Sequence, residues 1–181
     1  ARQSSCQSNH KQIGIAYMQY CQDYDEVWVR AAIYYAAPAY YTWPYIIQPY
    51  MKSNQIMTCP SATAERYAGV VNATTTMGTG MFSQLSSAAL ASLRAPASLI
   101  AAGDSGRLPP PTYSNQTYYL IDWDGEANID NAPPPEPRHN EGANMIFADG
   151  HAKWLSKTAY GDFTNASIPL ASMPYPEYWT P

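Results

Sequence analysis

The segment RHNEGANMIFADGHAKW, residues 138–154, gathers the side chains best suited to chemistry. His139, Asp149 and His151 are residue types that bind Zn²⁺ or act in acid–base catalysis. Their spacing argues against both roles, because a seven-residue strand between His139 and Asp149 would separate them by roughly 20 Å. We therefore interpret the segment as structural, with Asp149-Gly150 predicted to form a two-residue type I′ turn between two strands. His139 is expected to hydrogen-bond locally where the first strand begins.

A second group of polar side chains occupies alternate positions of the segment DWDGEANID. Its oxygen-bearing residues are Asp122, Asp124, Glu126, Asn128 and Asp130. Oxygen ligands at this spacing can wrap Ca²⁺, but the twelve-residue EF-hand pattern with its closing glutamate is missing. We interpret the segment as a polar loop without a cofactor and keep a Ca²⁺ site as the alternative.

Other signatures of catalysis or ligand binding are missing from the sequence. There is no G-x-S-x-G nucleophile elbow, and the Gly-Asp-Ser stretch at 103–105 lacks a glycine-rich phosphate turn. Only 13% of residues are charged and the net charge is −4, so no basic face indicates nucleic-acid binding. We expect a protein that is not an enzyme. The sequons at Asn72, Asn115 and Asn165 are candidate glycosylation sites, although chance explains them in a chain this rich in Ser, Thr and Asn.

The elements that would position these residues predict a single α+β domain. Apolar residues recur at spacings of three and four from Cys6 to Tyr24, which predicts a long amphipathic helix over residues 1–26. Alternating residues around Asp149-Gly150 predict a C-terminal hairpin over 143–155. We expect the helix to pack on a small antiparallel sheet joined by Pro-rich loops. No N-cap residue precedes the helix, so we also expect the natural chain to extend upstream.

Composition indicates contact surfaces. The chain has 16 tyrosines and 16 prolines beside 3 phenylalanines. Tyrosine offers a large contact area with a hydroxyl group that tolerates water, which suits contact with proteins or sugars. Proline suppresses unwanted pairing at strand edges. We divide the chain into a domain over 1–157 and a Pro- and Tyr-rich arm over 158–181.

Four sequence landmarks follow one another along the chain: SSCQSNHKQIGIAYMQYCQDYDE, PYMKSNQIMTCPSA, APASLIAAGDS and RHNEGANMIFADGHAKWL. In the last of them, nine residues separate His139 from Asp149-Gly150. In this order the landmarks resemble the bacterial type IV pilin-like proteins, or pseudopilins, that carry a C-terminal H-x9-D-G motif. The resemblance runs from residue 4 to about residue 155 and so covers most of the chain.

The resemblance implies a structural subunit of an extracellular filament on a bacterial cell surface. Such subunits are made as membrane-anchored precursors and assemble with identical copies into a helical homopolymer. The hydrophobic half of the anchoring helix is not in this sequence. We expect assembly contacts from the helix and the arm, through Ile13, Tyr17, Met18, Tyr175, Tyr178 and Trp179. The alternative is a minor pseudopilin or surface adhesin that recognises glycan or protein through exposed aromatic residues.

The resemblance also implies a disulfide between Cys6 and Cys59. In the chain-entropy model, closing that loop of about 50 residues is worth roughly 4 kcal/mol. Cys21 would then be the spare thiol. A Cys6–Cys21 bridge is excluded because that separation along one helix spans about 22 Å, whereas a Cys21–Cys59 bridge stays open. His10 stands where the family pattern commonly has Leu, and we interpret it as a partly buried, hydrogen-bonded residue.

Overall fold

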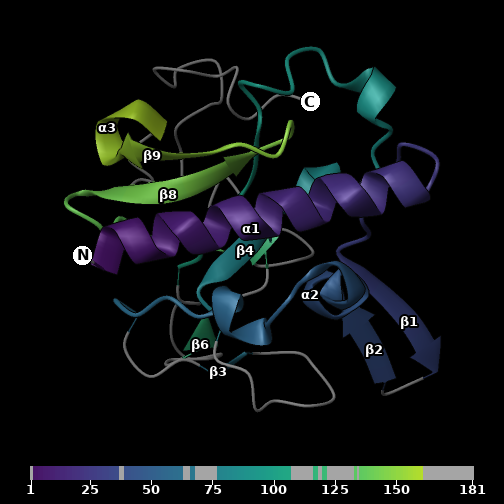
Figure 1. Cartoon of the computed structure of the whole chain (residues 1–181), viewed down its shortest axis with the longest axis horizontal. Helices are drawn as coiled ribbons and strands as arrows, with labels where there is room; N and C mark the ends of the chain where they lie inside the picture. The colour runs from purple at the N-terminus through teal and green to yellow at the C-terminus, as the bar shows by residue number, and fades with distance from the viewer. Residues whose placement is uncertain are drawn as a thin grey trace.

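The computed structural model describes most of the first 160 residues of the chain. The described ranges are 2–36, 39–62, 66–67, 77–106, 116–117, 120–121, 133 and 135–160. Within them the protein is α+β, as predicted, with one long N-terminal helix and a five-stranded sheet. Figure 1 shows the helix α1 lying across the sheet, with β8 and β9 running beside it.

The helix α1 (Arg2–Asp23) is amphipathic, and the predicted spacing of its inward residues is confirmed. The side chains buried along it include Cys6, His10, Ile13, Tyr17 and Cys21. The helix ends three residues before the predicted boundary at 26. Asp25 and Glu26 take left-handed φ values of 52° and 56°. The Glu26 amide then donates to the Cys21 carbonyl at 2.9 Å, which closes the last turn.

The main sheet has the strand order β7-β4-β5-β8-β9. Its strands are β4 (Thr79–Phe82), β5 (Ile100–Asp104), β7 (Leu120–Ile121), β8 (Gly142–Phe147) and β9 (Ala152–Ser156). Neighbours pair antiparallel except β4 and β7, which pair parallel. The prediction of a small antiparallel sheet is therefore correct in class, but the sheet is larger and mixed. Every residue of β5 and β8 is buried, which explains why β5 appears in the sequence as a continuous apolar run.

Shorter elements complete the domain. The strands β1 (Ala32–Ala36) and β2 (Ala39–Thr42) pair antiparallel, while β3 (Arg66–Tyr67) and β6 (Gln116–Thr117) pair parallel. The single-turn helices are α2 (Trp43–Ile46), η1 (Gln48–Tyr50), η2 (Asn54–Met57), η3 (Ser83–Leu85), η4 (Leu90–Ser92) and α3 (Lys157–Tyr160). Proline lies in the first turn of both α2 and η1, which is the helical position that tolerates it. α3 enters the segment predicted as the arm; the rest of the arm lies outside the described residues.

An aromatic cluster anchors the C-terminal half of α1. The Tyr17 ring stacks on Trp28 with 4.8 Å between ring centroids and meets Trp43 at 5.2 Å. All three side chains are fully buried. Burying rings of this size supplies a large share of the apolar area that holds a helix to its domain. The helix is thus fixed at this end by aromatic packing.

The turn between β8 and β9 differs from the prediction. The Gly150 amide donates to the Phe147 carbonyl at 2.8 Å, and the Phe147 amide donates to the His151 carbonyl at 2.9 Å. Gly150 has a φ of 89°, whereas Asp149 is not in the left-handed region that a type I′ turn requires there. The connection is a three-residue loop with a left-handed glycine. The predicted two-residue type I′ turn at Asp149-Gly150 is therefore wrong.

A two-residue turn of the type I′ kind occurs at the other end of β8. Asn140 and Glu141 have φ values of 50° and 56°. The backbones of the flanking residues His139 and Gly142 exchange both hydrogen bonds, at 2.9 and 3.1 Å. This turn joins His139 to the start of β8, which lies between β5 and β9 in the sheet.

Candidate functional site

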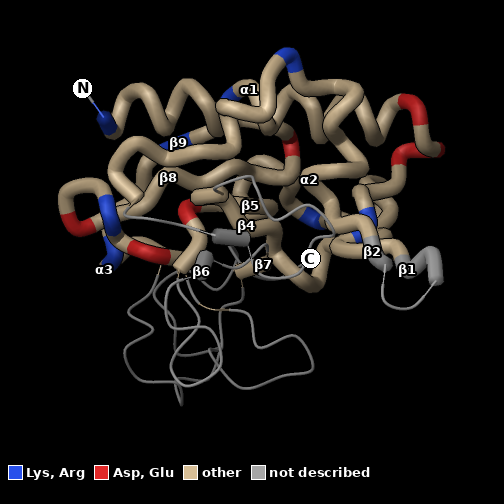
Figure 2. The backbone as a smooth tube through the Cα atoms, turned by 90° about the horizontal axis from the view of Figure 1, so that it is seen from below, with Lys and Arg blue, Asp and Glu red and all other residues tan. Residues whose placement is uncertain are grey.

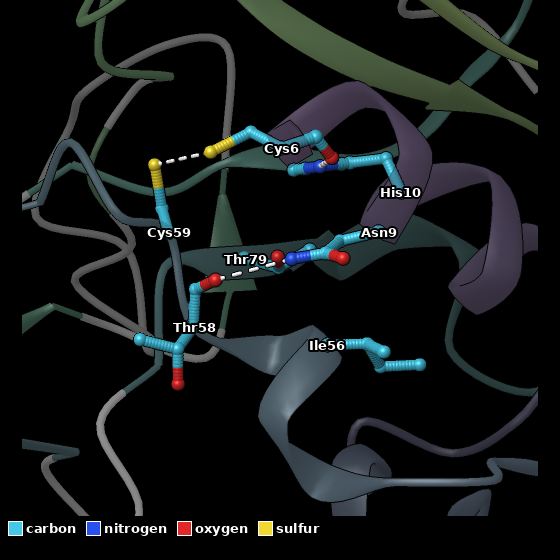
Figure 3. A pocket seen from close by; sticks show the side chains of 7 residues that line it. All are labelled: Cys6, Asn9, His10, Ile56, Thr58, Cys59 and Thr79. Carbon is cyan, nitrogen blue, oxygen red and sulfur yellow. Dashed lines mark hydrogen bonds between the residues drawn. The ribbon is translucent and has the colours of Figure 1, made fainter. Parts of the chain in front are cut away.

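Five titratable side chains from distant parts of the sequence meet beneath the N-terminal half of α1. Cys6 and His10 come from α1, Cys59 from the segment after η2, Asp104 from the end of β5 and His139 from the turn before β8. All five are buried. Figure 3 shows Cys6, His10 and Cys59 lining one pocket between α1 and the segment that carries Cys59.

The two sulfur atoms lie at the centre of this group. Cys6 Sγ is 2.7 Å from Cys59 Sγ, the contact drawn between them in Figure 3. The thiols are not joined in this structure, whereas a disulfide places the sulfurs about 2.05 Å apart. The Cys6–Cys59 disulfide therefore stays a prediction. The short distance between the two sulfur atoms is favourable to it. A Cys21–Cys59 bridge is excluded, because Cys59 lies beside Cys6 and the helix holds Cys21 about 22 Å from Cys6.

The two cysteines shift each other's pKa in opposite directions. A hydrogen bond with Cys6 holds the pKa of Cys59 well below its usual value. The same hydrogen bond, together with burial, raises the pKa of Cys6. Either sulfur can be the donor of this hydrogen bond.

Asp104 connects the two histidines of the group. Its Oδ2 accepts a hydrogen bond from the backbone N–H of Asn144 at 2.6 Å and lies 3.6 Å from His139 Nε2. Its Oδ1 lies 3.8 Å from His10 Nε2, and both of these atoms are buried without a hydrogen-bond partner. Buried polar groups normally find partners, so this pair indicates an incomplete polar site. His10 Nδ1 donates to the Cys6 carbonyl at 2.8 Å, which agrees with its interpretation as a hydrogen-bonded residue.

His139 is held on three sides. Its Nε2 lies 3.5 Å from Cys59 Sγ, and its carbonyl accepts the Trp154 indole N–H at 2.8 Å. A Cβ on Gly142 would come closer than 3.0 Å to the Trp154 ring, so the glycine leaves room for that indole. The predicted local bonding of His139 is correct for its backbone. Its imidazole instead reaches Cys59 and Asp104.

Asp149 and His151 form a separate pair at the opposite end of β8. Asp149 Oδ1 is 2.6 Å from His151 Nδ1, and the imidazole stacks on Phe147 at 4.4 Å between ring centroids. Both side chains are partly exposed, unlike His139. His139 and His151 therefore do not share a site, as the sequence spacing of the segment 138–154 predicts.

The predicted assembly residues of the helix need a correction. Ile13 and Tyr17 are fully buried in the chain's own core, and Met18 packs against that core. Neither Ile13 nor Tyr17 has a surface to offer to a neighbouring subunit in this fold. The exposed apolar residue of α1 is Ile15, at 57%.

Several predicted sites lie outside the described residues. They are the Ca²⁺ alternative (Asp122, Asp124, Glu126, Asn128 and Asp130), the sequons (Asn72, Asn115 and Asn165) and the aromatic residues of the arm (Tyr175, Tyr178 and Trp179). The structure leaves these predictions as they stand.

Asp104 is the member of the site that sequence reasoning missed. In the sequence it stands in the Gly-Asp-Ser stretch at 103–105, which lacks the glycine-rich turn of a nucleotide loop. The usable signal was a carboxylate at the end of an apolar run, because a buried carboxylate needs partners. Which partners it finds depends on the tertiary fold.

Comparison of this chain with known protein-family models, with curated proteins and with solved structures gave no match. Within the part of the chain that the structure describes, no helix combines the length and the apolar character needed to cross a membrane.

Proposed function

We propose that this chain is a structural, non-enzymatic subunit of an extracellular, pilin-like helical filament on a bacterial surface, built from identical copies. The sequence landmarks support the family. The observation that carries the proposal is the position of α1. The helix lies along one side of the domain, one of its faces is buried in the core, and the opposite face carries the exposed Ile15.

The outward face of α1 suits contact with another subunit. Its exposed residues after Arg2 are Ser4, Ser5, Ser8, Lys11, Gln12, Ile15, Gln19, Gln22 and Asp23. Most of them are short or uncharged, and Figure 2 shows few charged positions along α1. Burying an unpaired charge is costly, so a face of serine and glutamine around one isoleucine is easier to cover than a charged one.

Two exposed tyrosines outside α1 offer further contact area. Tyr24 is 53% exposed and stacks on Tyr20 at 4.3 Å between ring centroids. Tyr45 is 51% exposed and stacks on Tyr41 at 4.4 Å. A ring already held by a neighbouring ring loses little freedom when a partner covers it, which favours protein contacts.

The proposal is tested by charging the exposed face of α1. We expect the purified chain to sediment as a polymer, and Ile15→Glu to remain monomeric with unchanged circular dichroism. Ala97→Glu places the same charge on an exposed residue outside α1 and should assemble like the wild type. A wild-type chain that stays monomeric at high concentration would contradict the proposal, as would assembly of Ile15→Glu equal to that of the control.

The exposed tyrosine pairs also support a second candidate function. Aromatic faces of this kind stack on sugar rings or on protein side chains, which fits a minor pseudopilin or surface adhesin. This alternative predicts saturable binding on a glycan array without polymer formation. Binding should be lost in Tyr24→Ala or Tyr45→Ala and retained in Ile15→Glu.

A further inference from the structure

We propose that the chain, with its thiols reduced, binds one Zn²⁺ ion through Cys6 Sγ, Cys59 Sγ and His139 Nε2, with the Asp104 carboxylate close beside the site. This metal site is separate from the filament function and does not depend on it. Among the described residues, the two sulfurs and the imidazole are the one group of three soft or nitrogen donors whose ligand atoms all lie within 4.8 Å of one another.

The distances between these atoms fit one tetrahedral ion after a small adjustment. Zn–S bonds of about 2.3 Å and Zn–N bonds of about 2.0–2.1 Å place sulfur and nitrogen about 3.5 Å apart and two sulfurs about 3.8 Å apart. The Cys59 Sγ to His139 Nε2 distance is 3.5 Å. The sulfurs are 2.7 Å apart, so they must separate by about 1 Å, which a change in side-chain torsion provides.

Asp104 supplies the oxygen nearest to the imidazole. Its Oδ2 lies 3.6 Å from His139 Nε2, but Asp104 is outside the group whose ligand atoms all lie within 4.8 Å of one another, so the carboxylate contributes negative charge next to the ligands. The Asn144 amide that donates to Oδ2 holds the carboxylate from one side, and His10 faces its Oδ1 from the other. Such outer contacts orient the ligands of metal sites.

The charge of the group also favours a cation. Two thiolates and a carboxylate would be buried together, and isolated buried anions are costly unless they are paired or bind a metal. Two thiolates and one imidazole are donors that select zinc over the hard cations Mg²⁺ and Ca²⁺.

The sulfurs lie behind a thin wall of side chains. The small pocket in Figure 3 is lined by Cys6, Cys59 and His10, and also by Asn9, Ile56 and Thr58. The last three residues also line an open hollow on the surface. The small pocket has no room for a water molecule, so an ion enters from this hollow only when side chains between α1 and η2 move apart.

The test titrates the whole chain with Zn²⁺ under anaerobic conditions, after reduction and removal of metal with a chelator. We expect one zinc per chain, with binding lost in Cys6→Ser and Cys59→Ser. His139→Ala and Asp104→Asn should weaken binding at least about tenfold. Cys21→Ser alters a buried cysteine outside the site and should bind like the wild type. Co²⁺ in place of zinc should give thiolate-to-cobalt charge-transfer absorption, which both site-cysteine variants lose.

A measurement on the wild-type chain keeps the test valid even where a variant fails to fold. X-ray absorption of the zinc-loaded wild type should show two sulfur neighbours with the remaining ligands nitrogen or oxygen. A zinc shell of nitrogen and oxygen alone would overturn the proposal. Failure of the reduced wild type to bind zinc, or equal affinity in Cys59→Ser, would overturn it as well. None of these outcomes bears on whether the chain forms filaments.

Discussion

Gly14 of α1 lies directly against Gly150 in the turn between β8 and β9. A Cβ on Gly14 would come closer than 3.0 Å to the Gly150 carbonyl oxygen. Gly150 has a φ of 89°, and a Cβ there would meet Met18 of α1 at 2.6 Å. Gly150 thus has a structural role, because a residue without a side chain lets the turn pass close under the helix.

Gly14→Ala should destabilise the fold. In an uncrowded helix the change to alanine stabilises by up to about 1 kcal/mol. Here the added methyl meets backbone, so we expect a loss of about 1–3 kcal/mol in the free energy of unfolding. Denaturant unfolding measures it, with Gln12→Ala on the exposed face of α1 as the near-neutral control. A stabilised Gly14→Ala would show that the helix does not lie against the turn.

Asp104→Ala should leave the buried backbone N–H of Asn144 without its acceptor. We expect the reduced, metal-free chain to lose about 1–3 kcal/mol of stability, the desolvation cost of an unsatisfied buried group. Asp149→Ala removes a carboxylate that is partly exposed and should cost less, about 1 kcal/mol or below. The same denaturant experiment compares the two variants, and an equal loss in both would argue against a buried Asp104.

Cys21 gives the fold a dependence on alkaline pH. Burial, with a contribution from Glu26, raises its pKa from 9.0 to about 11. As the pH rises, the Cys21 thiol of the unfolded chain loses its proton before that of the folded chain. The free energy of unfolding is therefore highest below about pH 9 and falls between pH 9 and about pH 11. The loss is about 2–3 kcal/mol. Unfolding measured across this range should show a shallower decline in Cys21→Ala; identical pH profiles would place Cys21 in contact with water.

The Cys6–Cys59 disulfide is predicted for the protein in the extracellular location that we propose for it. Non-reducing peptide mapping should link the Cys6 and Cys59 peptides and leave Cys21 free. Reduction should then lower the free energy of unfolding by roughly 4 kcal/mol in the chain-entropy model. Zinc binding concerns the reduced state of the same pair, so the disulfide-linked chain should bind no zinc there. A bridge that includes Cys21 would contradict the placement of Cys59 beside Cys6.

The sequence predicts the elements whose signals are local. The spacing of Cys6, Ile13 and Tyr17 predicts the buried face of α1, and the structure confirms it. The helix ends earlier than its spacing pattern predicts because Asp25 and Glu26 adopt left-handed conformations that their residue types only weakly favour. The turn type at Asp149-Gly150 differs from the prediction because Asp-Gly is compatible with two loop lengths. The pairing of Ile146 with Ala152 and the Phe147–His151 hydrogen bond fix the longer one.

The candidate site could be predicted only in part, for a different reason. The family resemblance implies that Cys6 and Cys59 are paired, and the sequence identifies His139 as a candidate ligand or catalytic residue. Nothing local places Asp104 beside them, because its position depends on the pairing of β5 with β8 and on the turn at 140–141. The parallel pairing of β4 with β7 depends in the same way on distant segments.

Immunogold electron microscopy tests the proposed filament most directly. An antibody raised against this chain is applied to the native bacterial material, with a strain lacking the chain as the control. We expect gold particles in regular rows along extracellular filaments that are missing from the control strain. Label spread over the cell surface with no filaments, or filaments that remain unlabelled, would contradict it.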